Sequence, residues 1–131
     1  MRTLLMIKPN CTKINKIGEI LTIVEKAGFV IEAAKMLNFD KKTVAGFYAE
    51  HIGKDFFPRL EKFMCSGKTL AVVLSKDNAI EDLRMLVGDT NPDTAKEGSI
   101  RALYGLNVTQ NGVHASDSPS SALREINFLF S

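Results

Sequence analysis

One histidine near the end of the chain has the surroundings of a reactive group. His114 lies between Val113 and Ala115 and is followed by Ser116 and Asp117. An imidazole ring has an unperturbed pKa of about 6.5, so near neutral pH it can serve as a base, a metal ligand or a nucleophile that is covalently modified. Small neighbours leave the ring open to a reactant, and the adjacent hydroxyl and carboxylate can orient it. The segment predicts one of these roles, although a histidine in a polar turn more often has none.

Several polar residues spread along the chain have the chemistry of phosphate ligands. Lys8 ends a predicted strand, Arg84 lies on a predicted helix, and Arg101 follows a long polar loop. Cationic forks and point charges suit phosphate oxygens, and hydroxyl or amide groups such as those of Thr90 and Asn111 add further contacts. Taken one at a time, each of these residues is more often a solvated surface or turn residue.

Two aromatic residues lie beside a predicted helical hairpin. Tyr48 and Phe56 either border a cleft or pack in the core, and the pattern alone leaves both interpretations open. His51 has no comparable polar company, so we interpret it as a surface or helix-packing residue.

A segment that resembles the end of a phosphate-binding P-loop fails the test of spacing. Residues 66–69 read Ser-Gly-Lys-Thr, but the motif needs a further glycine at the position of Lys62. The motif also follows a strand, whereas this segment precedes one. The sequence therefore excludes a P-loop.

Length and composition are those of an ordinary globular protein. The chain has 131 residues, of which 24% are charged and 45% hydrophobic, and this predicts a single domain over residues 1–131. A net charge of +2 gives no reason to expect a nucleic-acid or membrane partner. Cys11 and Cys65 lie too far apart for a zinc motif. No apolar run approaches the roughly 18 residues of a membrane span, and the N-terminal run is too short for a signal peptide. We therefore expect a cytoplasmic protein.

Hydrophobic patterning predicts strands alternating with helices. Strands are expected over residues 3–8, 29–37 and 69–75, with a short edge strand within residues 111–118. Helices are expected over residues 17–27, 41–51, 58–66, 79–87 and 119–130, with Asp40, Asn78 and Ser118 as N-caps. This order resembles the split β-α-β-β-α-β arrangement with a helical hairpin inserted between the second and third strands. The predicted fold is therefore an α+β, ferredoxin-like sandwich, a four-stranded antiparallel sheet with its helices on one face.

Taken together, these residues resemble those of the nucleoside diphosphate kinase family, and the resemblance runs ungapped through essentially the whole chain. The matching blocks are Ile7-Lys8-Pro9, Gly18-Glu19-Ile20, Phe47-Tyr48, Phe56-Phe57, Gly88-Asp89-Thr90-Asn91-Pro92, Gly98-Ser99-Ile100-Arg101 and Asn111-Gly112-Val113-His114-Ala115-Ser116-Asp117. So many blocks in one order are far more specific than any one of them.

The resemblance implies an enzyme that moves the terminal phosphoryl group of a nucleoside triphosphate, mainly ATP, to a nucleoside diphosphate. The route would be ping-pong through phosphohistidine, with Mg²⁺ carried on the nucleotide. His114 would be the nucleophile, oriented by Ser116 and Glu125, while Phe56 would stack on the base with Val108 near it. Contacts to phosphates or sugar would come from Lys8, Tyr48, Arg84, Thr90, Arg101 and Asn111, with Lys8 and Tyr48 also taking part in catalysis.

Assembly and a few departures complete the comparison with the family. The family forms tetramers or hexamers, and the complete loop around Pro92 favours a homo-hexamer, with a tetramer as the alternative. Asn10-Cys11 stands where Asp-Gly is usual, Ala115 replaces a commoner glycine, and Ile52 occupies a usually basic or polar position. The chain also lacks the C-terminal extension of longer members. None of these departures removes an expected phosphate contact.

Two other classes of protein stay open at this stage. A catalytically weak homologue would keep the fold and act as a nucleotide-binding or interaction module, but here all the expected catalytic residues are present. A nucleic-acid-binding split β-α-β domain would need exposed aromatic residues on its sheet, flanked by basic ones. The strand around Val72 and Val73 has none. An assay of phosphate transfer from ATP to a second nucleoside diphosphate distinguishes both of these classes from an active kinase.

Overall fold

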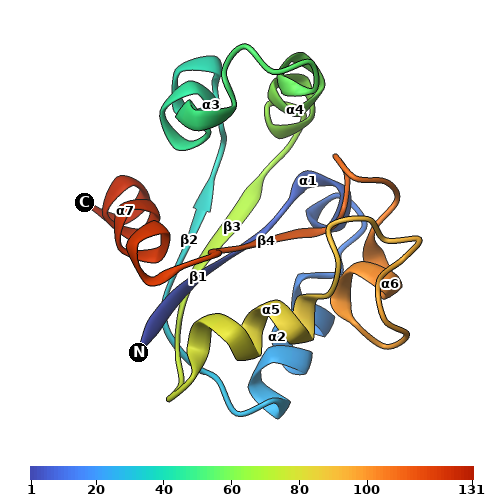
Figure 1. The fold of residues 1–131 in the computed structure, drawn as a ribbon, viewed down its shortest axis with the longest axis vertical. Helices are drawn as coiled ribbons and strands as arrows, with labels where there is room; N and C mark the ends of the chain where they lie inside the picture. The colour runs from blue at the N-terminus through green and yellow to red at the C-terminus, as the bar shows by residue number, and fades with distance from the viewer.

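A four-stranded antiparallel sheet lies at the centre of the molecule, which a computed structural model describes over residues 1–131 (Figure 1). The strands are β1 (Arg2–Ile7), β2 (Val30–Leu37), β3 (Thr69–Ser75) and β4 (Val113–Ala115). They stand in the order β2-β3-β1-β4, so the apolar strands β1 and β3 take the two central positions. This arrangement confirms the predicted α+β, ferredoxin-like fold.

Helices cover both faces of the sheet, so the expectation of helices on one face is wrong (Figure 1). Successive side chains of a strand point to opposite faces, and in β1 both sets are buried. Leu5 and Ile7 belong to one apolar cluster, whereas Leu4 and Met6 belong to another. A continuous apolar run, unlike an alternating one, needs cover on both sides. The composition of β1 therefore demands a three-layer structure.

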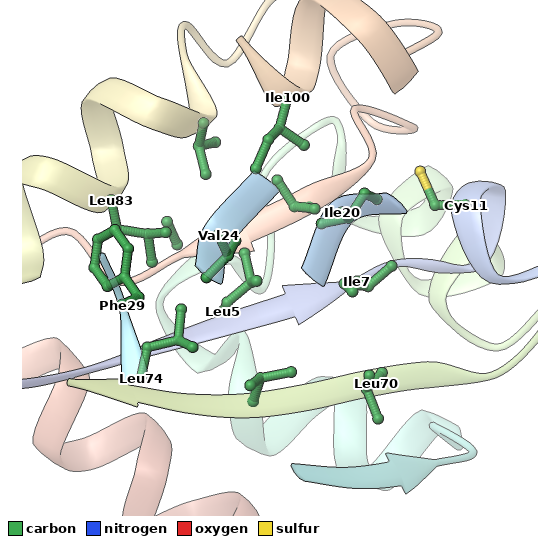
Figure 2. Close-up of a cluster of buried hydrophobic side chains, with 14 of the residues drawn as sticks. Leu5, Ile7, Cys11, Ile20, Val24, Phe29, Leu70, Leu74, Leu83 and Ile100 are labelled. Carbon is green, nitrogen blue, oxygen red and sulfur yellow. The ribbon is translucent and has the colours of Figure 1, made fainter. Parts of the chain in front are cut away.

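The helices form two layers, one on each face of the sheet. Helices α2 (Ile17–Lys26), α5 (Ala79–Val87) and α6 (Ile100–Tyr104) pack on one face, and α3 (Lys41–Phe47), α4 (Phe57–Met64) and α7 (Pro119–Phe130) on the other. Figure 2 shows Ile20 and Val24 of α2 over Leu5 and Ile7 of β1, with Leu83 of α5 in the same cluster. None of the helices has the length and apolar surface that a bilayer crossing requires.

Side chains fix the ends of the helices that flank the site. Asp40 accepts a hydrogen bond from a backbone N–H in the first turn of α3 at 2.8 Å, and Ser118 does the same for α7 at 3.1 Å. Such caps satisfy backbone donors that have no partner within the helix. Asn78 occupies the predicted capping position of α5, but its side chain bonds no backbone N–H and donates instead to Glu81 Oε2 at 3.1 Å.

The structure also contains short elements that the pattern did not predict. Helix α1 (Pro9–Thr12) starts at the proline that was expected only to stop a strand, because proline fits a first turn where no N–H bond is needed. Helix α6 has only five residues, too few to show a helical period. The helix expected over residues 41–51 ends at Phe47, and a 3₁₀ turn, η1 (Ala49–His51), follows it.

Candidate active site

Strand β4 carries His114 to the edge of the sheet beside β1. Its three residues pair with β1 so that His114 lies opposite Met6, while Val113 and Ala115 are buried on the other side of the strand. Gly112 enters the strand at a φ of +93°, a conformation that only glycine adopts readily. Its carbonyl accepts a bond from Lys8 N at 2.9 Å, which ties β4 to the end of β1.

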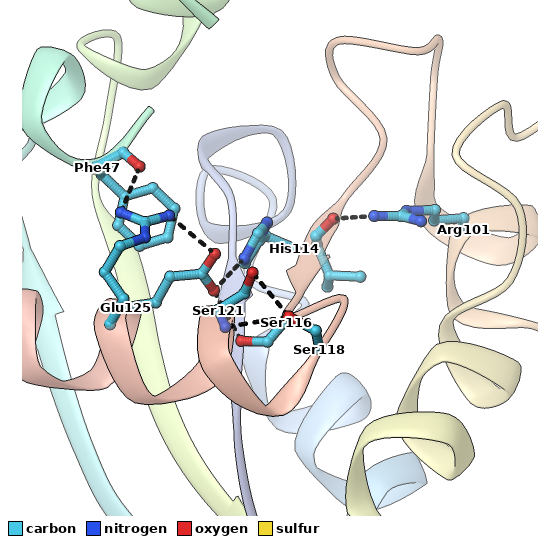
Figure 3. Close-up of polar contacts among 9 residues, drawn as sticks. Phe47, Arg101, His114, Ser116, Ser118, Ser121 and Glu125 are labelled. Atoms are coloured by element: carbon cyan, nitrogen blue, oxygen red, sulfur yellow. Dashed lines mark hydrogen bonds and ion pairs between the residues drawn. The ribbon is translucent and has the colours of Figure 1, made fainter. Parts of the chain in front are cut away.

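A buried carboxylate holds one nitrogen of the His114 ring (Figure 3). Glu125 Oε1 lies 2.8 Å from His114 Nε2 and accepts a second hydrogen bond from Ser116 Oγ at 2.7 Å. Burial favours the protonated form of Glu125, but the hydrogen bonds from His114 and Ser116 outweigh it and lower the pKa of the carboxyl. An ionised carboxylate can only accept hydrogen bonds. In the neutral ring the proton therefore sits on Nε2, and Nδ1 keeps a free electron pair.

Residues behind the histidine brace this pair. Arg124 lies with its guanidinium 3.6 Å from Glu125 Oε2 and donates to the carbonyl of Phe47 at 3.4 Å. The Phe47 ring meets the His114 ring edge to face, with 5.3 Å between the ring centroids. Helix α7 and the end of α3 thus fix the orientation of the imidazole from two directions.

The exposed side of His114 faces a cleft of about 520 Å³. This cleft brings together residues from stretches of sequence that lie far apart in the chain. Of the residues that the sequence singled out, Lys8, Tyr48, Phe56, Arg84, Thr90, Arg101, Val108, Asn111 and His114 line it. Ser116 and Glu125 do not reach the cleft and stand behind His114.

Lys8 is a buried ammonium at the floor of this cleft. Its Nζ donates to Asn111 Oδ1 at 3.0 Å, and the Asn111 amide in turn donates to the carbonyls of Thr90 at 3.2 Å and Val108 at 3.3 Å. Burial, aided by the nearby charge of Arg101, lowers the pKa of Lys8 to about 7. A bound anion would restore the charge of this lysine, so the site is suited to phosphate.

Arg101 is held equally firmly by backbone groups. Its guanidinium donates to the carbonyls of Gly88 at 3.0 Å and Val113 at 3.1 Å, the second of which Figure 3 shows. Burial and the neighbouring Arg84 lower the pKa of Arg101 to about 10, so it stays charged near neutral pH. Its Nε is buried without a hydrogen-bond partner in the protein. Buried donors rarely stay unpaired, so this one is suited to a ligand atom.

The Tyr48 hydroxyl is a second buried polar group without a partner. Burial raises the pKa of Tyr48, and the charge of Glu125 raises it further. The hydroxyl is therefore neutral and can donate a hydrogen bond into the cleft.

The cleft also contains residues that the sequence did not single out. His51, interpreted from the sequence as a surface or helix-packing residue, also lines the cleft: it stacks on Tyr48 with 6.0 Å between centroids and packs at a steep angle to Phe56 with 5.3 Å between centroids. Burial lowers the pKa of His51, and the charge of Lys54 lowers it further. Arg59 is another cleft residue for which the pattern gave no signal, because it is one exposed cation among many.

The acidic lining of the cleft is sparse. Asp117 is the only carboxylate among the residues that line it, and the protein holds no group of three or more His, Cys, Asp or Glu residues with metal-ligand geometry. A divalent cation in the cleft would therefore take most of its oxygen ligands from a bound phosphate chain and from water.

Comparisons with known proteins point to one family. A family model described as nucleoside diphosphate kinase matches residues 1–131. The nucleoside diphosphate kinase of Glaesserella parasuis serovar 5 (strain SH0165) is 50% identical over 129 residues, which cover 98% of this chain and 94% of that protein. The corresponding kinase of Pasteurella multocida (strain Pm70) is 50% identical over 129 residues, covering 98% of this chain and 93% of that protein.

Solved structures extend the likeness to three dimensions. The nucleoside diphosphate kinase of Aquifex aeolicus superposes with a TM-score of 0.95 at 40% identity, covering 99% of this chain and 94% of that one. A halophilic nucleoside diphosphate kinase from Halobacterium salinarum, solved in complex with CDP, gives a TM-score of 0.96 at 34% identity, covering 100% of this chain and 88% of that one.

Proposed function

Because this chain belongs to the nucleoside diphosphate kinase family, it transfers the γ-phosphoryl group of a nucleoside triphosphate to a nucleoside diphosphate, and we propose that the group travels on His114. The observation that carries this proposal is the bond between His114 Nε2 and the buried Glu125. It leaves Nδ1 as the free nitrogen of a ring that lines the cleft. Residues 1–131 would form one catalytic domain, and the alternative of a catalytically weak homologue is not favoured.

The reaction would consist of two displacements at one nitrogen. Nδ1 of His114 attacks the γ-phosphorus, the N–P bond forms as the bond to the β-phosphate oxygen breaks, and the diphosphate leaves. The Nε2 proton stays between the ring and Glu125, whose negative charge balances the positive charge that develops on the imidazole. A second diphosphate then attacks the phosphohistidine and reverses these steps.

The remaining polar residues would stabilise the transferring group. Phosphoryl transfer asks a protein mainly for positioning and charge stabilisation. Lys8, Arg84 and Arg101 supply positive charge to the phosphoryl oxygens, and the buried, unpartnered hydroxyl of Tyr48 can donate a further hydrogen bond. The amide and hydroxyl of Asn111 and Thr90 would contact phosphates or sugar. Because Lys8 and Arg101 are already held by hydrogen bonds within the fold, little reorganisation of these two cations is needed when the charge shifts.

The open end of the cleft would receive the base. Phe56 and Val108 line this end, and a base between them would stack on the phenyl ring. Any purine or pyrimidine offers a π-face, so ring contact alone discriminates weakly. The Halobacterium salinarum relative with bound CDP is consistent with a site that accepts pyrimidines.

Enzymes of this family bind nucleotides and need a divalent cation. We infer that this protein uses Mg²⁺ carried on ATP or another nucleotide, because the cleft has a single carboxylate, Asp117, and no protein cage for a metal. The ion would neutralise phosphate charge.

We further infer that the protein forms a homo-oligomer, with a hexamer favoured over a tetramer. We expect it in the cytoplasm, without a nucleic-acid or membrane partner.

Phosphoenzyme labelling tests the central step. Incubation with γ-labelled ATP and Mg²⁺ should give an acid-labile, base-stable phosphoprotein that loses its label when a nucleoside diphosphate is added. His114→Ala should accept no label. His51→Ala changes the only other histidine of the chain and should still be labelled, although more slowly, because its ring lines the same cleft. Label retained by His114→Ala would refute the proposed nucleophile.

A further inference from the structure

A second hollow adjoins the nucleotide cleft at its base end. It has a volume of about 770 Å³ and lies among α1, α4 and the segment before β4. The two hollows share Arg59, Val108 and Thr109. All charged residues that line the second hollow, namely Lys13, Arg59 and Lys62, are cationic. The base end of the cleft therefore opens toward a positive surface that carries no carboxylate.

Arg59 is the one cation that faces both hollows, and its donors are free. The side chain is exposed and takes part in none of the ion pairs of the protein. Arg101, by contrast, is held by two backbone carbonyls, and Lys13 donates to Ser66 Oγ at 3.0 Å. Arg59 therefore has its full set of N–H groups available for a ligand.

The position of Arg59 on its helix directs it toward the base. Phe56 immediately precedes the first residue of α4, and Arg59 lies three positions after Phe56. Side chains three positions apart share one face of a helix. The Lys54 ammonium lies over the Phe56 ring, 5.9 Å from its centroid. Lys54 and His51 thus pack around the Phe56 ring. A base that stacks on the part of the ring open to the cleft would present its outer edge on the side that Arg59 also lines.

We propose that Arg59 reads the outer edge of the base and makes the enzyme prefer keto bases to amino bases. A guanidinium has only donors, and it pairs with the O6 and N7 acceptors of guanine or the O4 of uracil and thymine. Adenine and cytosine present an amino group at the same position. The N–H donors of the guanidinium would then face the N–H donors of the base, and no hydrogen bond could form. This inference rests on the proposed function, because it takes the base to lie between Phe56 and Val108. Since the guanidinium is exposed, the expected preference is modest, about three- to tenfold.

Two measurements with the four diphosphates GDP, ADP, UDP and CDP test the inference. The first is equilibrium binding of each diphosphate to the unphosphorylated protein, and the second is single-turnover discharge of the phosphorylated enzyme. The quantities compared are the GDP/ADP and UDP/CDP ratios of affinity and of discharge rate. Both ratios should exceed one in the unaltered protein, approach one in Arg59→Gln, and fall below one in Arg59→Glu, whose carboxylate accepts from amino groups. Lys62→Gln, which changes a cation that lines only the second hollow, should leave both ratios as they were.

The outcomes separate this inference from the proposed function. Failure to form a phosphoenzyme would count against the proposed function, while the binding ratios would still decide the role of Arg59. Ratios that stay the same in Arg59→Glu would overturn the inference. An equal loss of affinity for all four diphosphates would also overturn it, because Arg59 would then act on the phosphates. An equal shift of the ratios in Lys62→Gln would do the same, because it would indicate a general electrostatic effect of the positive surface instead of a contact with the base.

Discussion

The two ends of the cleft are built in opposite ways. At the phosphate end, Lys8, Arg101 and His114 are each tied to other protein groups by hydrogen bonds of 2.8 to 3.1 Å. At the base end, Phe56 is only half-buried, and Arg59 is exposed and unpaired. Charge that must be placed accurately in a transition state gains from fixed donors. A base that only needs a surface to stack on gains little from fixed donors. The same cleft can therefore position the phosphates accurately and still accept different nucleosides.

This contrast predicts that the largest losses follow changes behind His114. Glu125→Gln replaces an acceptor with an amide that can donate to Nε2, so the ring proton shifts to Nδ1 and blocks the nucleophile. We expect kcat to fall by on the order of 10⁴, as when a catalytic histidine is held in the wrong tautomer. Nucleotide affinity should change little. Steady-state kinetics and equilibrium binding measure the two effects.

A carboxylate elsewhere provides the control for that substitution. Glu81 is exposed and does not line the cleft, so Glu81→Gln should keep full kcat. Normal turnover of Glu125→Gln would show that the hydrogen bond at 2.8 Å does not set the tautomer.

The same conservative change at the two ends should give very different results. Arg101→Lys removes the guanidinium that donates to the carbonyls of Gly88 and Val113 at the same time. An ammonium on a flexible stem cannot reach both carbonyls. We expect kcat to fall by about 10². Arg59→Lys keeps a cation at a position where the side chain has no partner within the protein, so it should change kcat by less than about threefold. Equal effects on kcat would contradict the difference between the two ends.

Lys8 should make nucleotide binding dependent on pH. Burial and the charge of Arg101 lower its pKa to about 7 in the free protein, and bound phosphate favours the charged form and so raises it again. Above pH 7, and below the pKa of Lys8 in the complex, binding must take up a proton, so affinity should fall by up to tenfold per pH unit. Below pH 7 the lysine is protonated in both states and contributes no such dependence.

Calorimetry at pH 8 in buffers of different ionisation enthalpy measures this proton directly. Phosphate groups have already lost their protons at that pH, because their second pKa is about 6. Lys8→Arg keeps its charge throughout this range, so proton uptake should disappear in that variant. Uptake that persists in Lys8→Arg would assign the proton to another group.

Sequence patterning predicted the elements that bury long apolar surfaces. The run of β3 and the caps of α3 and α7 were confirmed because each depends on local chemistry. The helical cover on both faces differs from the prediction, because the split β-α-β order resembles a two-layer sandwich, whereas the apolar run of β1 is buried on both sides. Helices α1 and α6 are too short to leave a periodic signal.

The residues of the candidate site were predictable only in part. His114, Lys8 and Arg101 stand in blocks whose order resembles a known family, and the fold brings them to one cleft. His51 and Arg59 could not be selected in this way, because their importance comes from tertiary neighbours. His51 meets Tyr48 and Phe56 because it lies in the turn η1 between α3 and α4, and Arg59 lines the cleft from the first turn of α4.

The smallest expected effect lies at the base end, where Phe56→Leu tests whether the cleft needs an aromatic ring. Leucine keeps apolar contact but loses the flat π-face on which a base stacks. We expect the KM for every diphosphate to rise by about three- to fivefold, with kcat within about twofold of its original value, because the phosphate end stays intact. Phe128→Leu, an exposed ring outside the cleft, should leave KM unchanged. A large fall in kcat for Phe56→Leu would mean that this ring also positions the phosphates, and the two ends of the cleft would then act as one unit.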